Sequence, residues 1–220
     1  MIRSSIALLA LSLAASGTYA GTPVAPMGKA PVQQPVYEEP VLISYDNVSL
    51  YYQYRTADFL GIDVDGHGAG LGLEISPVDH LYFALGGSWT DIDFGVDLDY
   101  WQANAGIGGY IPITNNIHFV TEVGVNYANL ALADFDDIST DDWGVYVTPH
   151  FRAKWGFFET HVGVSYTSNE LVLSEWNAFA KFLFEVSPEL DLFVAGTYGF
   201  EEADGFDDVF GAQAGIRFKF

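Results

Sequence analysis

Apolar and polar residues alternate along most of this chain. In residues 209–220, Phe210 and Phe218 fall on one face, whereas Gln213 and Lys219 fall on the other. A period of two residues is typical of β-strands whose two faces meet different surroundings. Ten such segments follow one another, at 47–57, 67–76, 80–90, 99–112, 116–130, 143–154, 157–168, 175–186, 190–201 and 209–220. The pattern therefore predicts an all-β chain of ten strands, with eight strands as the alternative.

The predicted connections are alternately short and long. We expect tight turns at 76–79, 114–115, 155–156 and 187–189, and longer loops near 58–66, 91–98, 131–142, 169–174 and 202–208. Short turns at one end and longer loops at the other are typical of antiparallel barrels that span a membrane. Most segments also have the roughly 9–11 residues that a tilted strand needs to cross a bilayer. We therefore predict a transmembrane antiparallel up-and-down β-barrel with both chain ends on the short-turn side.

A barrel or sandwich surrounded by water would show the same alternation, with its apolar face turned inward. Its polar face should then be densely charged, whereas the polar face here consists mainly of Gly, Ser, Thr, Asn and Gln. All five tryptophans fall by parity on the apolar face, each near a strand end: Trp89, Trp101, Trp143, Trp155 and Trp176. Since tryptophans at the ends of membrane strands form aromatic girdles, this placement favours a membrane barrel.

The first 46 residues differ in character from the rest. Residues 1–20 contain Arg3, a short apolar run and a small-residue cleavage site that ends at Ala20, which together predict a secretory signal peptide. Residues 21–46 contain five prolines and favour extended, unpacked chain. We expect a Pro-rich periplasmic linker at 21–46, with insertion of this segment into the barrel as the alternative, and the barrel domain at 47–220.

Composition limits the classes of function. The chain has 8 Lys and Arg against 29 Asp and Glu, a net charge of −21, whereas a nucleic-acid binder needs basic residues to neutralise phosphates. Its 17 Phe, 13 Tyr and 5 Trp supply enough apolar surface to argue against general disorder. Without cysteine it has no disulfide, thiolate metal site or catalytic thiol. We expect no nucleic-acid partner and no cofactor, apart from the calcium considered below.

The signal peptide, the ten alternating segments and the C-terminal residues 216–220 resemble small outer-membrane β-barrel proteins of Gram-negative bacteria, a porin-like group. The resemblance covers 47–220 and is architectural. It implies Sec-type export, signal-peptide cleavage and insertion into the outer membrane as a monomer, among its lipid and lipopolysaccharide. In that family a terminal aromatic residue is part of the signal read by the barrel-assembly machinery, which points here to Phe218 and Phe220.

All basic residues of the barrel domain fall on the inward face by parity. Together with five inward acids they form a predicted lumen ion-pair network: Arg55, Glu74, Glu122, Arg152, Lys154, Glu159, Lys181, Glu185, Asp191, Arg217 and Lys219. Desolvated ions must be paired, so we interpret the network as closing or nearly closing a narrow lumen. The alternative is a water-filled pore, for which five inward glycines would leave space: Gly68, Gly70, Gly72, Gly106 and Gly108.

Two cross-strand pairings follow from the predicted turns. A two-residue turn at 155–156 sets Arg152 opposite Glu159, and Glu122 on the preceding strand could extend the pair to a ladder. Across the next tight turn Glu185 faces Asp191, a like-charge pair that needs a basic neighbour.

Counted over 58–66, 91–99, 131–142, 170–175 and 201–208, the predicted loop regions hold nineteen acidic residues and no basic ones. Such a rim attracts cations and repels anions. Five aspartates near 131–142 form a candidate Ca²⁺ site, because calcium takes several oxygen ligands: Asp134, Asp136, Asp137, Asp141 and Asp142. The alternative for these residues is a solvated anionic surface.

Two further groups near the rim resemble the active site of omptin proteases, ten-stranded barrels that activate water with an Asp pair and an Asp–His pair. Asp91 and Asp93 match the first pair and Asp65 and His67 the second in type and spacing. Their order along the chain is reversed, and the predicted barrel lacks the tall extracellular extension of omptins. We therefore expect no enzyme.

Three functions remain open, in a fixed order of preference. The first is a structural barrel or a narrow, cation-preferring porin-like barrel. The second is a surface adhesin or ligand-binding barrel that acts through its acidic loops. The third is a rim protease of the omptin kind.

Overall fold

The computed structural model describes residues 43–93, 97–132, 135–202 and 206–220. These residues form ten strands: β1 Asn47–Phe59, β2 Ile62–Val78, β3 Leu81–Asp93, β4 Asp97–Thr114, β5 Ile117–Leu132, β6 Phe135–Trp155, β7 Phe158–Thr167, β8 Ser174–Ser187, β9 Leu190–Glu202 and β10 Phe206–Lys219. In the described part of the chain, no helix has the length and hydropathy needed to span a bilayer.

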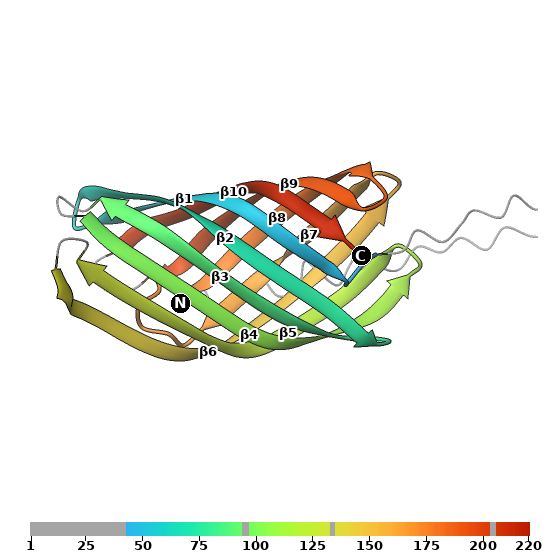
Figure 1. Cartoon of the computed structure of the whole chain (residues 1–220), viewed down its shortest axis with the longest axis horizontal. Helices are drawn as coiled ribbons and strands as arrows, with labels where there is room; N and C mark the ends of the chain where they lie inside the picture. Colours follow the sequence, from blue (N-terminus) through green and yellow to red (C-terminus); the bar gives the residue numbers. More distant parts are fainter. Residues whose placement is uncertain (1–42, 94–96, 133–134, 203–205) are drawn as a thin grey trace, which may run out of the picture. The chain divides into compact units, whose positions relative to one another are not determined.

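Every strand pairs with its sequence neighbours, and β1 pairs with β10 to close a barrel (Figure 1). All ten pairings are antiparallel. The closing seam runs from Asn47 opposite Lys219 to Phe59 opposite Phe206. Because closure leaves no unpaired strand edge, every strand of the sheet is protected. The predicted ten-stranded up-and-down barrel is confirmed, and the eight-stranded alternative is wrong.

The burial of side chains is the reverse of that in a protein surrounded by water. Large apolar side chains such as Leu50, Val145 and Phe200 are at least half exposed on the outer wall. Polar side chains such as Gln53 and Arg152 are buried inside, with 1% of their surface accessible. This follows from the strand period, since successive side chains point to opposite faces of the sheet.

One end of the barrel carries four two-residue turns, at 79–80, 115–116, 156–157 and 188–189. Residue Phe220 and the segment 43–46 lie at this same end, where the Phe220 amide donates a hydrogen bond to the Asp46 carbonyl at 3.2 Å. The turn between β6 and β7 lies at 156–157, one residue later than the predicted 155–156. Its true site is set by Gly156, whose positive φ of 57° allows the tight reversal.

The opposite end, here called the loop end, differs more from the prediction. The expected loop at 58–66 is a hairpin turn of Leu60 and Gly61, both with positive φ, and β6 already begins at Phe135. The segment 168–173 is a loop, close to the predicted 169–174. Outside the bilayer the outer face of a strand no longer needs to be apolar. The backbone hydrogen bonds between strands therefore continue into residues where apolar and polar side chains no longer alternate. The alternation therefore could not mark these strand ends.

The strands are consequently longer than a membrane crossing requires. β2 has 17 residues and β6 has 21. At about 3.3 Å per residue and a tilt of roughly 40°, seventeen residues rise about 43 Å. This exceeds the roughly 30 Å of a hydrocarbon core. The barrel is thus taller at its loop end than the sequence predicted.

Candidate functional site: the barrel lumen

The end of the lumen near the short turns is filled by a buried ion-pair network. Arg152 of β6 lies 2.9 Å from Glu159 of β7 through Nη2 and 3.2 Å from Glu74 of β2 through Nη1. Arg217 of β10 reaches Glu159 Oε2 from its Nη2 at 2.6 Å, and its Nε donates to Asp191 Oδ2 at 2.7 Å. Arg152, Glu159, Asp191 and Arg217 are all buried. Glu159 thereby joins two arginines that come from strands on opposite sides of β7.

Lys219 connects the remaining acids to the network. Its Nζ lies 3.0 Å from Glu185 and 2.9 Å from Asp191, which stand opposite each other on β8 and β9. Lys154 approaches Glu185 at 2.7 Å. The like-charge pair therefore has the basic neighbours that the sequence reasoning required.

The register of β6 and β7 differs from the predicted one. Arg152 stands opposite His161, and Lys154 stands opposite Glu159, because the turn lies at 156–157. Arg152 still reaches Glu159 diagonally, since its side chain is long enough to cross two positions of the ladder. His161 Nε2 also lies 2.7 Å from Glu159 Oε1.

Three of the predicted network residues lie outside the ion pairs of the described part. Glu122 accepts hydrogen bonds from the hydroxyls of Tyr82 at 3.0 Å and Tyr146 at 2.6 Å, so the predicted ladder with Arg152 does not form. Lys181 lies over the ring of Phe193, 3.9 Å from its centroid. Both carboxylate oxygens of Glu122 therefore accept hydrogen bonds from tyrosine hydroxyls. The alternation of apolar and polar residues did not identify these tyrosines as partners.

The third of these residues is Arg55, which lies nearer the loop end. Its guanidinium makes one long hydrogen bond, 3.4 Å, to Gln102 and stands 5.7 Å from the ring centroid of Tyr100.

The segment 43–46, directly before β1, packs into the network. The Ser44 carbonyl accepts a hydrogen bond from Arg152 Nη2 at 2.8 Å. The guanidinium of Arg152 lies 4.3 Å from the centroid of the Tyr45 ring, and that ring stacks on Tyr110 at 4.2 Å. The hydroxyl of Tyr45 lies 3.0 Å from His118 Nδ1. Burial raises the pKa of this hydroxyl above its ordinary value, so it stays protonated and can donate to the histidine.

The buried part of this segment fell inside the predicted linker. Ile43 and Tyr45 are both buried and form an apolar cluster with Tyr82, Ala84 and Val120. The available signal was their apolar character at the end of a Pro-rich stretch. Residues 43–46 lie inside the barrel, and residues 21–42 fall outside the described residues.

The inward glycines leave less space than the pore alternative required. A Cβ at Gly70 would overlap the ring of Tyr51, and a Cβ at Gly108 would overlap the ring of Tyr82. Tyr146 covers Gly106 in the same way. These glycines therefore admit tyrosine rings into the lumen, where they occupy the space that a channel would need.

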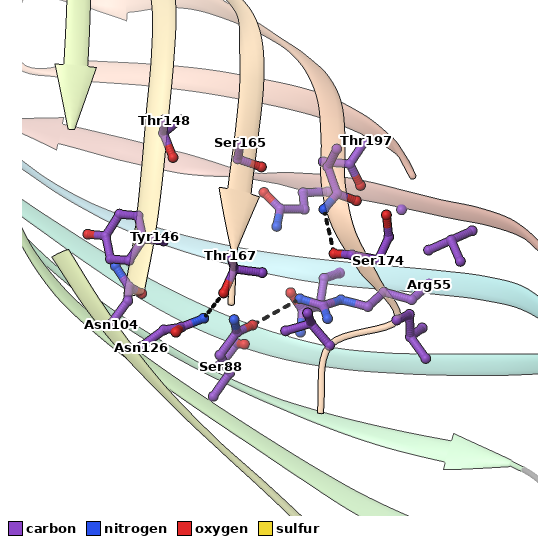
Figure 2. Close-up of a pocket in the computed structure, with 18 of the residues that line it drawn as sticks. Arg55, Ser88, Asn104, Asn126, Tyr146, Thr148, Ser165, Thr167, Ser174 and Thr197 are labelled. Atoms are coloured by element: carbon purple, nitrogen blue, oxygen red, sulfur yellow. Dashed lines mark hydrogen bonds between the residues drawn. The ribbon is translucent and has the colours of Figure 1, made fainter. Parts of the chain in front are cut away.

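The described residues enclose a larger and a smaller cavity in the lumen. The larger, about 350 Å³, lies toward the loop end, and the smaller, about 190 Å³, lies next to the ion-pair network. Tyr51, Asn104 and Glu122 line both, so these side chains separate them. Figure 2 shows the larger cavity, lined by side chains from several strands. Its wall is mainly polar and uncharged, with Arg55 as its one arginine, whereas the smaller cavity is lined by several charged residues of the ion-pair network.

The chain has no match among known protein families or among curated proteins. Among solved structures it is similar to neisserial surface protein A, with 14% identity, 80% of this chain and 98% of that one covered, and a TM-score of 0.43. It is also similar to the beta domain of the Bordetella autotransporter BrkA, with 8% identity, coverages of 81% and 100%, and a TM-score of 0.49. It is similar as well to the outer membrane protein OprG from Pseudomonas aeruginosa, with 14% identity, 80% of this chain and 97% of that one covered, and a TM-score of 0.38.

The assignment of this chain rests on its own inside-out burial. A closed barrel with apolar side chains outside and polar ones inside satisfies its backbone within the sheet and presents hydrocarbon to lipid. The chain has the architecture of a transmembrane β-barrel.

All five tryptophans stand on the outer wall of the barrel. Trp101, Trp143 and Trp155 are about half exposed or more. Trp89 lies opposite Trp101 and donates from Nε1 to Asp99 Oδ1 at 2.8 Å. Trp176 packs against the rings of Tyr166 and Phe200. Trp155 adjoins a short turn and the other four lie toward the loop end, so the five occupy two levels.

The C-terminal aromatics face outward as well. Phe218 is 50% exposed and Phe220 is 67% exposed. Phe218 pairs with Val48 across the closing seam. Both side chains are therefore accessible on the outer wall beside the place where the barrel closes.

The candidate calcium residues are only partly described. Asp134 lies outside the described residues, as do the side chains of Asp136 and Asp137. Asp141 is exposed, and Asp142 Oδ2 accepts a hydrogen bond from the Glu170 amide at 2.7 Å. Within the described ranges, no group of three or more His, Asp or Glu side chains is arranged to hold a metal ion.

The residues that resemble an omptin site lie together, but on the outer wall of the barrel. Asp65 stands opposite Asp93, and His67 opposite Asp91, on the adjacent strands β2 and β3. Asp65, His67 and Asp93 are exposed, and Asp65 accepts a hydrogen bond from the hydroxyl of Tyr54 at 2.6 Å. The four side chains do not face the lumen.

Proposed function

We propose that this protein is a non-enzymatic outer-membrane barrel with a structural role in the membrane. Its lumen is closed at the end that carries the short turns, which faces the periplasm in this proposal, so that solutes do not pass. The observation that supports this most directly is the buried network around Glu159, which joins Arg152 of β6 to Arg217 of β10. Export by the Sec route, cleavage of the signal peptide after residue 20, assembly by the barrel-assembly machinery and a monomeric state among lipid and lipopolysaccharide belong to the same proposal.

The energetics favour a closure that is permanent rather than gated. A buried ion that loses one partner costs about 3–5 kcal/mol, because the other charge is left desolvated. Glu159 and Asp191 are each bound by two basic residues, and Arg152 is additionally bound to the Ser44 carbonyl. Opening a water path requires several of these contacts to break together. Thermal fluctuation therefore opens the network rarely.

Planar-bilayer recordings of the refolded full-length chain test the proposal. We expect no steady channel from the native protein. The double substitution Arg152→Ala and Arg217→Ala removes both bridging guanidinium groups and should create a measurable conductance. Arg55→Ala is the matched control, because Arg55 lies outside the network. A large, steady conductance from the native barrel would refute closure and favour the cation-preferring porin alternative.

A second candidate is a surface-binding role through the acidic loop end. The supporting observation is that Asp63, Asp65 and Asp93 are exposed on the outer wall of β2 and β3, toward the loop end. A basic partner surface would complement them. Cells that display the barrel with all three changed to Asn should lose salt-sensitive binding of polylysine-coated beads relative to native cells. Unchanged binding would count against this role.

A further inference from the structure

We propose that the larger lumen cavity is a binding site for a small neutral polyhydroxylated solute, a sugar of about disaccharide size. The cavity of about 350 Å³ lies between the rings of Tyr51 and Tyr146 and the loop end of the barrel. A volume of this order falls at the lower end of those of ordinary ligand sites, which run from about 300 to 1,000 Å³. The inference goes beyond the proposed closure, because binding at equilibrium does not depend on whether the network below conducts.

Most polar side chains on the wall of the cavity bond to one another, but three hydroxyl groups do not. Figure 2 shows Thr148 of β6, Ser165 of β7 and Thr197 of β9 lining the same space as Arg55. None of the side-chain hydrogen bonds among the described residues involves these three hydroxyls. Hydroxyl groups donate and accept, so they match the hydroxyls of a sugar better than they match an apolar ligand.

The floor of the cavity supplies a flat apolar surface. Tyr51 lines both cavities, and its ring lies over Gly70. Tyr146 lines the same cavity and directs its hydroxyl to Glu122. A sugar ring has a polar edge and a C–H face, and the face can lie on an aromatic ring while the edge makes hydrogen bonds.

Charge selects a neutral solute over an ionic one. The two ionic residues that line the cavity are Arg55 and Glu122, and both oxygens of Glu122 already accept phenol hydrogen bonds. Arg55 makes one hydrogen bond of 3.4 Å to Gln102 and stands 5.7 Å from the ring centroid of Tyr100, so several of its five N–H donors are available to hydroxyl oxygens of a ligand. An anion would have to cross the acidic loop end, which repels it.

Saturation-transfer NMR on the refolded full-length barrel in detergent tests the site, with maltose as the neutral probe and galacturonate as the anionic one. We expect maltose to bind with a Kd on the order of 1 mM, the affinity that a few hydrogen bonds and one stacked ring supply, and galacturonate to bind at least several-fold more weakly. Absence of maltose binding at about 100 mM, or tighter binding of galacturonate, would overturn the proposal.

Two variants tie the binding to this cavity. Ser165→Phe fills it and should weaken maltose binding at least about tenfold, whereas Val164→Phe adds the same ring to the outer wall of the same strand and should leave binding unchanged. If Ser165→Phe fails to fold, judged by the heat-dependent gel mobility of intact barrels, the isosteric pair Thr148→Val and Thr197→Val should weaken binding without filling space. Equal affinity in that pair and the native chain would overturn the assignment.

Discussion

Replacing Arg152 with Met should destabilise the barrel more than any other single removal of a lumen charge. The substitution keeps the apolar stem but removes hydrogen bonds to Glu159, Glu74 and the Ser44 carbonyl. Glu159 retains Arg217 and His161, and among the described residues Glu74 retains only the Asn47 amide, so the hydrogen bonds lost without an ionic replacement are those to Glu74 and to the carbonyl. At about 2 kcal/mol for each hydrogen bond to a charged group, the free energy of unfolding should fall by about 4 kcal/mol.

The measurement is reversible urea unfolding in lipid vesicles, followed by tryptophan fluorescence. Arg55→Met is the matched control, since Arg55 makes one hydrogen bond of 3.4 Å and one distant ring contact, and it should cost about 1 kcal/mol or less. If the two variants lower the free energy of unfolding equally, or if Arg152→Met changes it by less than about 1 kcal/mol, the reasoning about the buried network is wrong.

Three further outcomes are expected. Tyr45→Ala should lower the free energy of unfolding by about 3 kcal/mol, the usual cost of removing a buried aromatic ring, and should raise bilayer conductance; a stable, silent variant would show that segment 43–46 is dispensable. Gly108→Ala should cost about 1–3 kcal/mol because its Cβ would overlap the ring of Tyr82, whereas Gly109→Ala, whose Cβ meets only ordinary contacts, should cost little in the same urea assay. Gly61→Ala should cost about 1 kcal/mol, because φ of 83° is unfavourable for alanine; an unchanged unfolding midpoint would contradict this.

The membrane-crossing part of the fold was predictable because one face of each strand must be apolar there. Parity alone placed residues such as Arg152 and Arg217 inside and Trp101 outside, as the structure has them. Parity carries no information along the strand axis, which is why the turn between β6 and β7 was displaced by one residue. It also fails beyond the bilayer, so the beginning of β6 at Phe135 was read as loop.

The partners of lumen residues were less predictable than their direction. Glu122 was assigned to an ion-pair ladder, but it lies against the hydroxyls of Tyr82 and Tyr146. Which side chains meet across the lumen depends on the curvature of the sheet and on its shear. The alternation of apolar and polar residues along one strand predicts neither of them. The two cavities, and the penetration of Tyr45 into the lumen, follow from the same three-dimensional closure.

The closing seam gives the ion-pair network a place in the order of folding. Arg217 and Lys219 are contributed by the last strand, whereas Ser44 and Tyr45 precede the first, so the network joins the two extremes of the barrel sequence. The contacts of Arg152 with Glu74 and with the Ser44 carbonyl span 78 and 108 residues of sequence, and such contacts form slowly because a long loop must be closed first. Before β10 meets β1, Arg152 can already pair with Glu159 across β6 and β7, and Arg217 and Lys219 with Asp191 across β9 and β10. The contacts that depend on closure are those of Arg152 with Glu74 and with the Ser44 carbonyl. Closure of the barrel therefore completes the network by joining strand pairs that already hold most of its charges together, and a barrel without its final strand lacks the Arg217 and Lys219 that pair with Asp191.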